Sequence, residues 1–163
     1  MAWSLRTTQL WLVVALYCAH GDSRVVAAPS PHTFEVDEVN IRYFVEGKGE
    51  PVVLIHGLHS SAQMNWMING VFAGLAKDHQ VIALGLPGHG QSDKPVDENA
   101  YGTQVVADVV ALLDHLNIKR AHVVGYSLGG MVAVQLLVTY PERTLSGTLG
   151  GMGSPYARTS QYQ

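Results

Sequence analysis

A serine between two glycines is the feature of this sequence that most directly suggests chemistry. Ser127 lies in the segment Gly125-Tyr126-Ser127-Leu128-Gly129, which follows a β-branched run and precedes a long apolar segment. On a sharp turn between a strand and a helix, a serine hydroxyl is held clear of the sheet and beside the free N–H groups of the helix. Glycines at positions 125 and 129 permit this turn, because side chains there would collide. The spacing predicts a nucleophile elbow, and the alternative is a glycine-rich turn with a surface serine.

Two other loops with histidine and glycine also follow predicted strands. His56-Gly57-Leu58 comes directly after the apolar run 52–55, and the loop 86–93 (Leu-Pro-Gly-His-Gly-Gln-Ser-Asp) comes after the apolar run 81–84. Short uninterrupted apolar runs are typical of strands that are buried on both faces of a parallel sheet. Each of the three motifs therefore stands at the end of a predicted strand.

The elements that position these motifs alternate between strands and helices. A hairpin is predicted from residues 33–37 and 41–45, and later strands are predicted at 52–55, 81–84, 121–126 and 144–149. Helices are predicted from Ser60 or Ser61 to about Lys77, from about Thr103 to Leu116, and from Met131 to Tyr140. Such alternation implies right-handed crossovers and an α/β fold, in which helices cover both faces of a mostly parallel sheet.

The apolar residues of the first two helices indicate which sides face the core. In the first helix, which Asn69-Gly70 is expected to kink or break, the inward residues are Met64, Met67, Ile68, Phe72 and Leu75. In the second helix, one stripe contains Val105, Val106, Val109, Leu112, Leu113 and Leu116, and Asn117 is the expected stop. Asp108 and Asp114 are expected as charges on the helix surface.

Composition limits the possible functions of the chain. It has 163 residues, of which 47% are hydrophobic and 14% charged, and its net charge of −3 includes no basic stripe. This suits one globular domain and argues against binding to nucleic acid. No glycine-rich phosphate-binding pattern is present, so no nucleotide cofactor is expected. His56 and His59 lack a nearby cysteine or a clear third ligand, so we expect no metal site.

The first 28 residues have the features of a secretory signal peptide. Arg6 precedes an apolar segment at 10–19, and Val26-Ala27-Ala28 supplies small residues for cleavage before Pro29. We therefore expect a secreted or periplasmic protein with no stable membrane partner after cleavage; the alternative is an uncleaved membrane anchor. The sole cysteine, Cys18, lies in this segment, so the expected domain at 29–163 has no disulfide.

The three motifs, in this order, resemble the α/β-hydrolase superfamily in its esterase, lipase and perhydrolase-like branch. The resemblance extends over roughly residues 33–153. It implies that Ser127 is the nucleophile and that the backbone N–H groups of Leu58 and Leu128 form the oxyanion hole. It also implies that Gly57 keeps the backbone open beside this site and that His56 braces the loop, the alternative role of His56 being general base.

The sequence departs from the family pattern in two places. Gly85 stands where the family often has an aspartate before the Pro-Gly-His-Gly loop, which puts the bracing of that loop in doubt. In this fold an acid and then a histidine follow the serine, but here the last carboxylate is Glu142 and the last histidine is His122. We therefore expect the domain at 29–163 to be an N-terminal portion of the fold, without the cap, the late acid or the late histidine.

The resemblance implies a serine hydrolase that acts on ester or related acyl bonds of a small-molecule substrate through an acyl-serine. Such an enzyme would be incomplete as it stands, because a serine hydroxyl is a poor nucleophile without an adjacent base. Hydrolysis of a C–C bond, perhydrolysis and acyl transfer to a nucleophile other than water are also open. The alternative is a catalytically inactive fragment or a ligand-binding relic of the same fold. Tyr126 is expected either to fill the core or to lie beside the acyl pocket, with the core slightly favoured.

Overall fold

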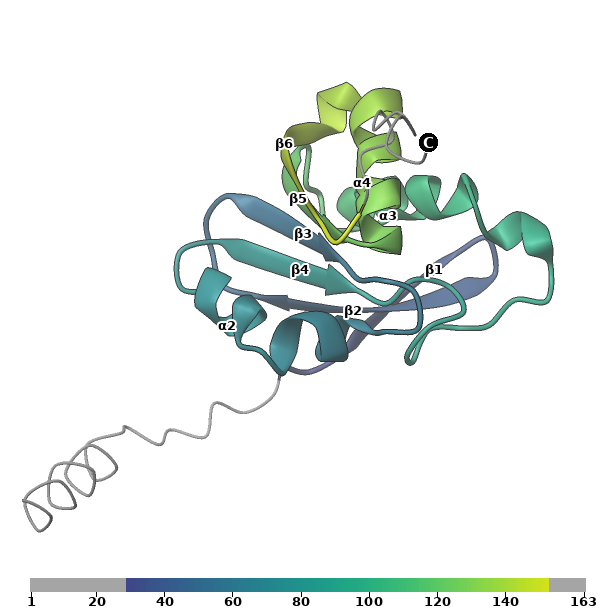
Figure 1. The fold of residues 1–163 in the computed structure, drawn as a ribbon, viewed down its shortest axis with the longest axis horizontal. Helices are drawn as coiled ribbons and strands as arrows, with labels where there is room; N and C mark the ends of the chain where they lie inside the picture. The colour runs from purple at the N-terminus through teal and green to yellow at the C-terminus, as the bar shows by residue number, and fades with distance from the viewer. Residues whose placement is uncertain (1–28, 153–163) are drawn as a thin grey trace, which may run out of the picture.

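The computed structural model describes residues 29–152. The predicted signal peptide lies outside this range, as do the last residues of the predicted domain. The described residues form one six-stranded sheet with helices on both faces (Figure 1). None of the helices within the described range is long and apolar enough to reach across a membrane.

The sheet combines an antiparallel hairpin with four parallel strands. Its strands are β1 (His32–Val36), β2 (Val39–Glu46), β3 (Pro51–Ile55), β4 (Gln80–Leu84), β5 (Ala121–Tyr126) and β6 (Thr144–Gly150). Their order is β1-β2-β4-β3-β5-β6; β2 pairs antiparallel with β1 and β4, whereas the pairs β3–β4, β3–β5 and β5–β6 are parallel. The predicted mostly parallel α/β sheet is confirmed, and each strand lies within two residues of its predicted bounds.

Two hydrophobic cores lie on opposite faces of the sheet. One core joins the sheet to α3 (Gln104–His115) and α4 (Leu128–Thr139), and the other joins it to the π-helix η1 (Gln63–Met67) and α2 (Val71–Leu75) (Figure 1). Strand residues alternate between the two cores: Val53 and Ile55 belong to the first, Val52 and Leu54 to the second. This alternation explains why β3 is apolar throughout, as expected for a strand that is covered on both faces.

The helix predicted from about residue 60 to residue 77 is two short helices. Gly70 takes a left-handed conformation with φ of 77° and separates η1 from α2, which confirms the break predicted at Asn69-Gly70. The predicted inward face is partly wrong, because Met64 and Ile68 are exposed and Trp66 is buried. The wider π-helical turn and the break change the residue spacing from that of a continuous α-helix, so the predicted stripe does not stay on one side.

Helix α3 has the predicted apolar stripe, but one of its two acidic residues predicted at the surface is buried. The helix ends as predicted at Asn117, which has a φ of 56°. Asp108 is not a surface charge: it is only 3% exposed, and the Gln104 side chain donates a hydrogen bond of 3.1 Å to it. Burial raises the pKa of Asp108 from 3.8 to about 6, because the charged carboxylate loses hydration.

Candidate active site

Ser127 occupies the junction between β5 and α4. Its φ of 52° and ψ of −114° are an unusual backbone conformation for a residue with a side chain. The backbone around it is fixed, because the Ser127 N–H donates a 2.8 Å hydrogen bond to the carbonyl of Gly150 at the end of β6. The strand, the sharp turn and the helix are the arrangement that the sequence predicted for this segment.

Gly125 and Gly129 are required by close backbone contacts around the turn. A Cβ at position 125 would overlap the carbonyl oxygen of Gly129, and a Cβ at position 129 would overlap the carbonyl oxygen of Ile55. Backbone atoms cannot move aside as the end of a flexible side chain can. The helix therefore begins directly against the ends of β3 and β5. The predicted need for glycine at positions 125 and 129 agrees with these overlaps.

The loop after β3 lies against the serine. A Cβ at Gly57 would be 3.3 Å from the Cβ of Ser127 and 3.2 Å from the ring of Tyr126. The Gly57 N–H donates a 3.0 Å hydrogen bond to Oδ1 of Asn65 in η1. The sequence analysis missed Asn65, because an asparagine within a helix has no motif that identifies it as a partner of a loop eight residues earlier.

His56 is buried and has both ring nitrogens occupied. Nδ1 lies 2.8 Å from the carbonyl of Gly57, which can only accept, and Nε2 accepts a 3.0 Å hydrogen bond from the N–H of Leu86. Desolvation lowers the pKa of His56 to about 4, and nearby His89 also lowers it, against the raising effect of the Gly57 carbonyl. His56 is thus a neutral imidazole that joins two loops, and neither nitrogen is free to act as a base.

The loop at residues 86–93 is braced by residues at its own end. The buried Ser92 hydroxyl donates a 2.7 Å hydrogen bond to the carbonyl of Gly85 and accepts a 3.0 Å hydrogen bond from the N–H of Arg42. The Asp93 carboxylate accepts from both the backbone and the side chain of Asn40, and these bonds lower its pKa. These contacts tie the loop to β2, so the glycine at position 85 does not leave it unsupported.

The two residues whose backbone N–H groups were predicted as oxyanion donors are Leu58 and Leu128. Leu128 is the first residue of α4, where N–H groups have no acceptor within the helix. The N–H of Leu58 follows Gly57, which lies against Ser127, and it donates to no other residue within the described range. The role of these two N–H groups as oxyanion donors stays a prediction from the sequence.

Comparison with known proteins agrees with this geometry. The family model for the alpha/beta hydrolase fold matches residues 50–156, which is well over half of the chain. This chain belongs to the alpha/beta hydrolase fold family. Both predicted loops and the elbow fall within the matched range.

Several relatives of this hydrolase-fold chain have names that describe enzymes. A dihydrolipoyllysine-residue acetyltransferase component of an acetoin cleaving system from Pseudomonas putida is 37% identical over 83% of this chain and 36% of the relative. A 2-hydroxymuconate semialdehyde hydrolase from a Pseudomonas species is 40% identical over 60% of this chain and 34% of the relative. The chain thus spans about a third of the length of these curated relatives.

A solved structure supports the same assignment. Est816, described as an N-acyl homoserine lactone degrading enzyme, is 35% identical and superposes with a TM-score of 0.65 over 72% of this chain and 44% of its own. Both sequence and backbone therefore place this chain among the α/β-hydrolases.

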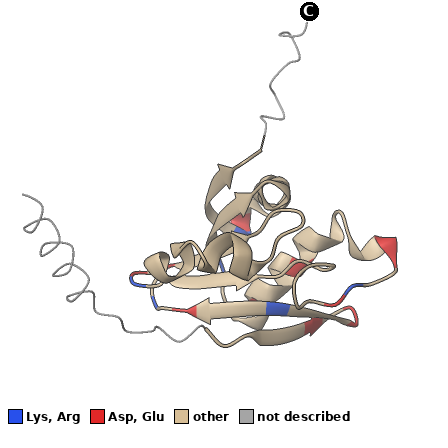
Figure 2. Cartoon of the chain, turned by 60° about the horizontal axis from the view of Figure 1, so that its bottom comes forward, with Lys and Arg blue, Asp and Glu red and all other residues tan. Residues whose placement is uncertain are grey.

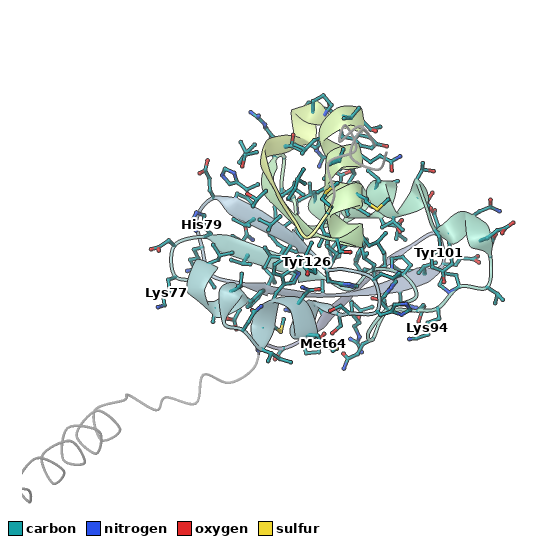
Figure 3. The ribbon with its side chains drawn as sticks, viewed as in Figure 1. Met64, Lys77, His79, Lys94, Tyr101 and Tyr126 are labelled. Carbon is teal, nitrogen blue, oxygen red and sulfur yellow. The ribbon has the colours of Figure 1, made fainter. Side chains whose placement is uncertain are left out.

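The structure places Tyr126 outside the core. The sequence analysis slightly favoured a place in the core, but 46% of Tyr126 is exposed. Its ring (labelled in Figure 3) lies within reach of a Cβ built at Gly57 or at Gly151, so it lies against the backbone at both positions. Tyr126 is thus not a core residue, and its predicted alternative position beside an acyl pocket stays a prediction.

No histidine or carboxylate within residues 29–152 makes a hydrogen bond to the Ser127 hydroxyl. The histidine side chains that form hydrogen bonds in this range contact other groups. The described part of the fold therefore places the loop at Gly57 against Ser127, and no base in it is hydrogen-bonded to the Ser127 hydroxyl.

Proposed function

We propose that this chain carries the nucleophile and oxyanion site of a serine hydrolase that acts on ester or related acyl bonds. Ser127 would attack the carbonyl carbon of a small acyl substrate, and the N–H groups of Leu58 and Leu128 would bind the oxygen that becomes negative. The observation that carries the proposal is the strained backbone of Ser127 at the β5–α4 turn.

In such a site, two kinds of group lower the barrier to acylation: the two N–H donors and a base. Each well-aimed oxyanion donor contributes about 3–4 kcal/mol to the stability of the transition state. Loss of a triad member commonly lowers the rate by about 10⁴-fold or more. Because no base contacts Ser127 in the described residues, we expect this chain alone to acylate slowly and to turn over poorly.

The names of the relatives fit an acyl substrate, but they do not distinguish hydrolysis from acyl transfer. Est816 is described as degrading N-acyl homoserine lactones, and the Pseudomonas putida relative is named as the acetyltransferase component of an acetoin cleaving system. Attack of a serine on an acyl carbon is a step that is compatible with hydrolysis and with acyl transfer. We therefore propose the acyl-serine as the common intermediate.

The competing proposal is that this chain has the fold of the family but that Ser127 is catalytically inactive. A fluorophosphonate probe distinguishes the two, because it modifies serines that are nucleophilic and lie beside an oxyanion hole. We expect the folded chain to gain the probe at Ser127, as located by peptide mass mapping, and the Ser127→Ala variant to lose that adduct. A chain unfolded in urea serves as the control. A folded chain with no adduct at Ser127 would exclude the enzyme proposal for this polypeptide.

A further inference from the structure

A second serine, far from the elbow, contacts a histidine that also faces a carboxylate. The Oγ atom of Ser146 in β6 lies 2.7 Å from Nδ1 of His122 in β5. Nε2 of the same ring lies 3.4 Å from Oε2 of Glu50, just before β3. A nucleophile, a base in hydrogen-bond contact with it and a third group that orients the base form the arrangement that activates serines.

A bulge in β6 creates this contact. Thr144 lies opposite Ala121, but Ser146 lies opposite His122, so Leu145 is one extra residue in β6. Without the bulge, the regular register would place Leu145 beside the imidazole. Bulges of this kind redirect side chains and are frequent near functional sites.

The backbone around the bulge is held in place. The guanidinium of Arg120 donates two hydrogen bonds, of 2.8 and 3.2 Å, to the carbonyl of Thr144. The Thr144 hydroxyl donates a 3.0 Å bond to the carbonyl of Pro141. On the other side, the carbonyl of Glu50 accepts a 3.2 Å bond from the N–H of Gln80. The contact between serine and histidine is therefore supported at the strands that carry it.

The carboxylate determines which nitrogen of His122 can act as a base. A carboxylate only accepts hydrogen bonds, so the contact with Glu50 favours the tautomer of His122 in which Nε2 carries the proton. Nδ1 then has a free lone pair and accepts the hydrogen bond from the Ser146 hydroxyl. The ring is oriented for proton transfer from the serine.

The group is separate from the elbow. His122 lies five residues before Ser127 along the same extended strand, which is about 16 Å. The three side chains lie at the surface, where 30% of the His122 side chain and 66% of that of Glu50 are exposed. This exposed position favours small acyl donors that are already activated. Such donors can reach the serine at the surface, and they react without being held in a pocket.

We propose that Ser146 is a second acyl-accepting nucleophile, with His122 as its general base and Glu50 as the group that orients His122. In the reaction, the Ser146 hydroxyl proton passes to Nδ1 of His122 and Oγ forms a bond to the acyl carbon of an aryl ester. The bond from that carbon to the aryl oxygen breaks, and the aryloxide takes the proton from His122. The products are an acyl ester on Ser146 and a phenol.

The test uses p-nitrophenyl acetate on the full chain that carries Ser127→Ala, so that a failure of the elbow proposal does not affect the result. We expect peptide mapping to locate an acetyl group on Ser146. Addition of Ser146→Ala should abolish that adduct, addition of His122→Gln should slow it at least tenfold, and Glu50→Gln should slow it several-fold. The matched control is Thr148→Ala, which removes another exposed hydroxyl of β6 and should leave the rate unchanged.

Two results would overturn the proposal. One is acetylation of Ser146 no faster than that of the Thr148 hydroxyl on the same strand. The other is a Ser146 acetylation rate that does not change in the His122→Gln variant, provided that its circular dichroism spectrum shows the parent fold.

Discussion

At the scale of single residues, His56 and Ser127 differ in the hydrogen bonds that their side chains make. Both nitrogens of His56 are used in bonds between loops, and its low pKa keeps it neutral above about pH 4. The Ser127 hydroxyl has no bond to the start of α4. The histidine of the His56-Gly57-Leu58 motif thus has a structural role, which the family resemblance predicted and the hydrogen bonds explain.

The two elbow glycines should be intolerant of a single methyl group. Gly129→Ala places a Cβ onto the Ile55 carbonyl oxygen, so we expect the free energy of unfolding to fall by about 3 kcal/mol or more. Gly74→Ala is the matched control, because a Cβ there meets no atom within 4 Å. That change should raise stability by about 0.5–1 kcal/mol, since alanine favours a helix. Equal effects of both variants in urea unfolding would contradict this account of the elbow.

Asp108 should make stability depend on pH below neutrality. Its pKa is raised from 3.8 to about 6 in the folded chain, so the folded state binds a proton more tightly than the unfolded state. The free energy of unfolding contributed by Asp108 should therefore fall by up to about 3 kcal/mol as the pH rises from about 4 to about 6, and stay level above that.

Asp108→Asn should remove this dependence, because asparagine remains neutral and its oxygen can still accept the bond from Gln104. Urea unfolding between pH 4 and pH 7 measures the effect. A difference in stability between the parent and Asp108→Asn that does not change over this range would show that the carboxyl is not buried as the structure has it.

At the scale of elements, the sequence predicted the strands and the long helices better than the short ones. The apolar runs that became β3 and β4, and the stripe of α3, each have one periodicity over their whole length. The segment 62–76 mixes a π-helical turn, a left-handed glycine and a short helix, so no single period describes which side chains are inward. The same irregularity hid Asn65, whose contact depends on three-dimensional packing.

Asn65 is expected to matter for both the loop and the serine. Asn65→Ala leaves the partly buried N–H of Gly57 without its acceptor, so unfolding should become easier by about 1–3 kcal/mol. Labelling of Ser127 by the fluorophosphonate should also slow, because the Leu58 N–H is in the same loop.

The control for Asn65 is Met64→Ala, which alters the adjacent residue of η1. Met64 is 62% exposed (Figure 3), so its truncation should change stability by less than about 0.5 kcal/mol. A loss from Met64→Ala as large as that from Asn65→Ala would mean that the side of η1 that faces the core is wrongly placed.

At the scale of the whole molecule, the order of the strands determines which loops lie beside the elbow. Charged residues of the described range lie at separate places on strands, helices and turns (Figure 2). The order of the strands brings the ends of β3 and β5 together, and this adjacency places Gly57 against Ser127. The alternation of strands and helices and the order of the motifs predicted the fold, whereas the contact of Ser127 with the loop at Gly57 required the structure.

Whether Ser127 forms an acyl-serine is the central question. The most direct measurement is the mass of the folded chain after prolonged incubation with p-nitrophenyl butyrate, because acylation is expected to be slow, with peptide mapping of any adduct. The account predicts a butyryl group on Ser127 in the parent chain and its loss in Ser127→Ala and in the urea-unfolded chain. A folded parent chain that carries no acyl group on Ser127, under conditions in which Ser146 is acylated, would contradict it.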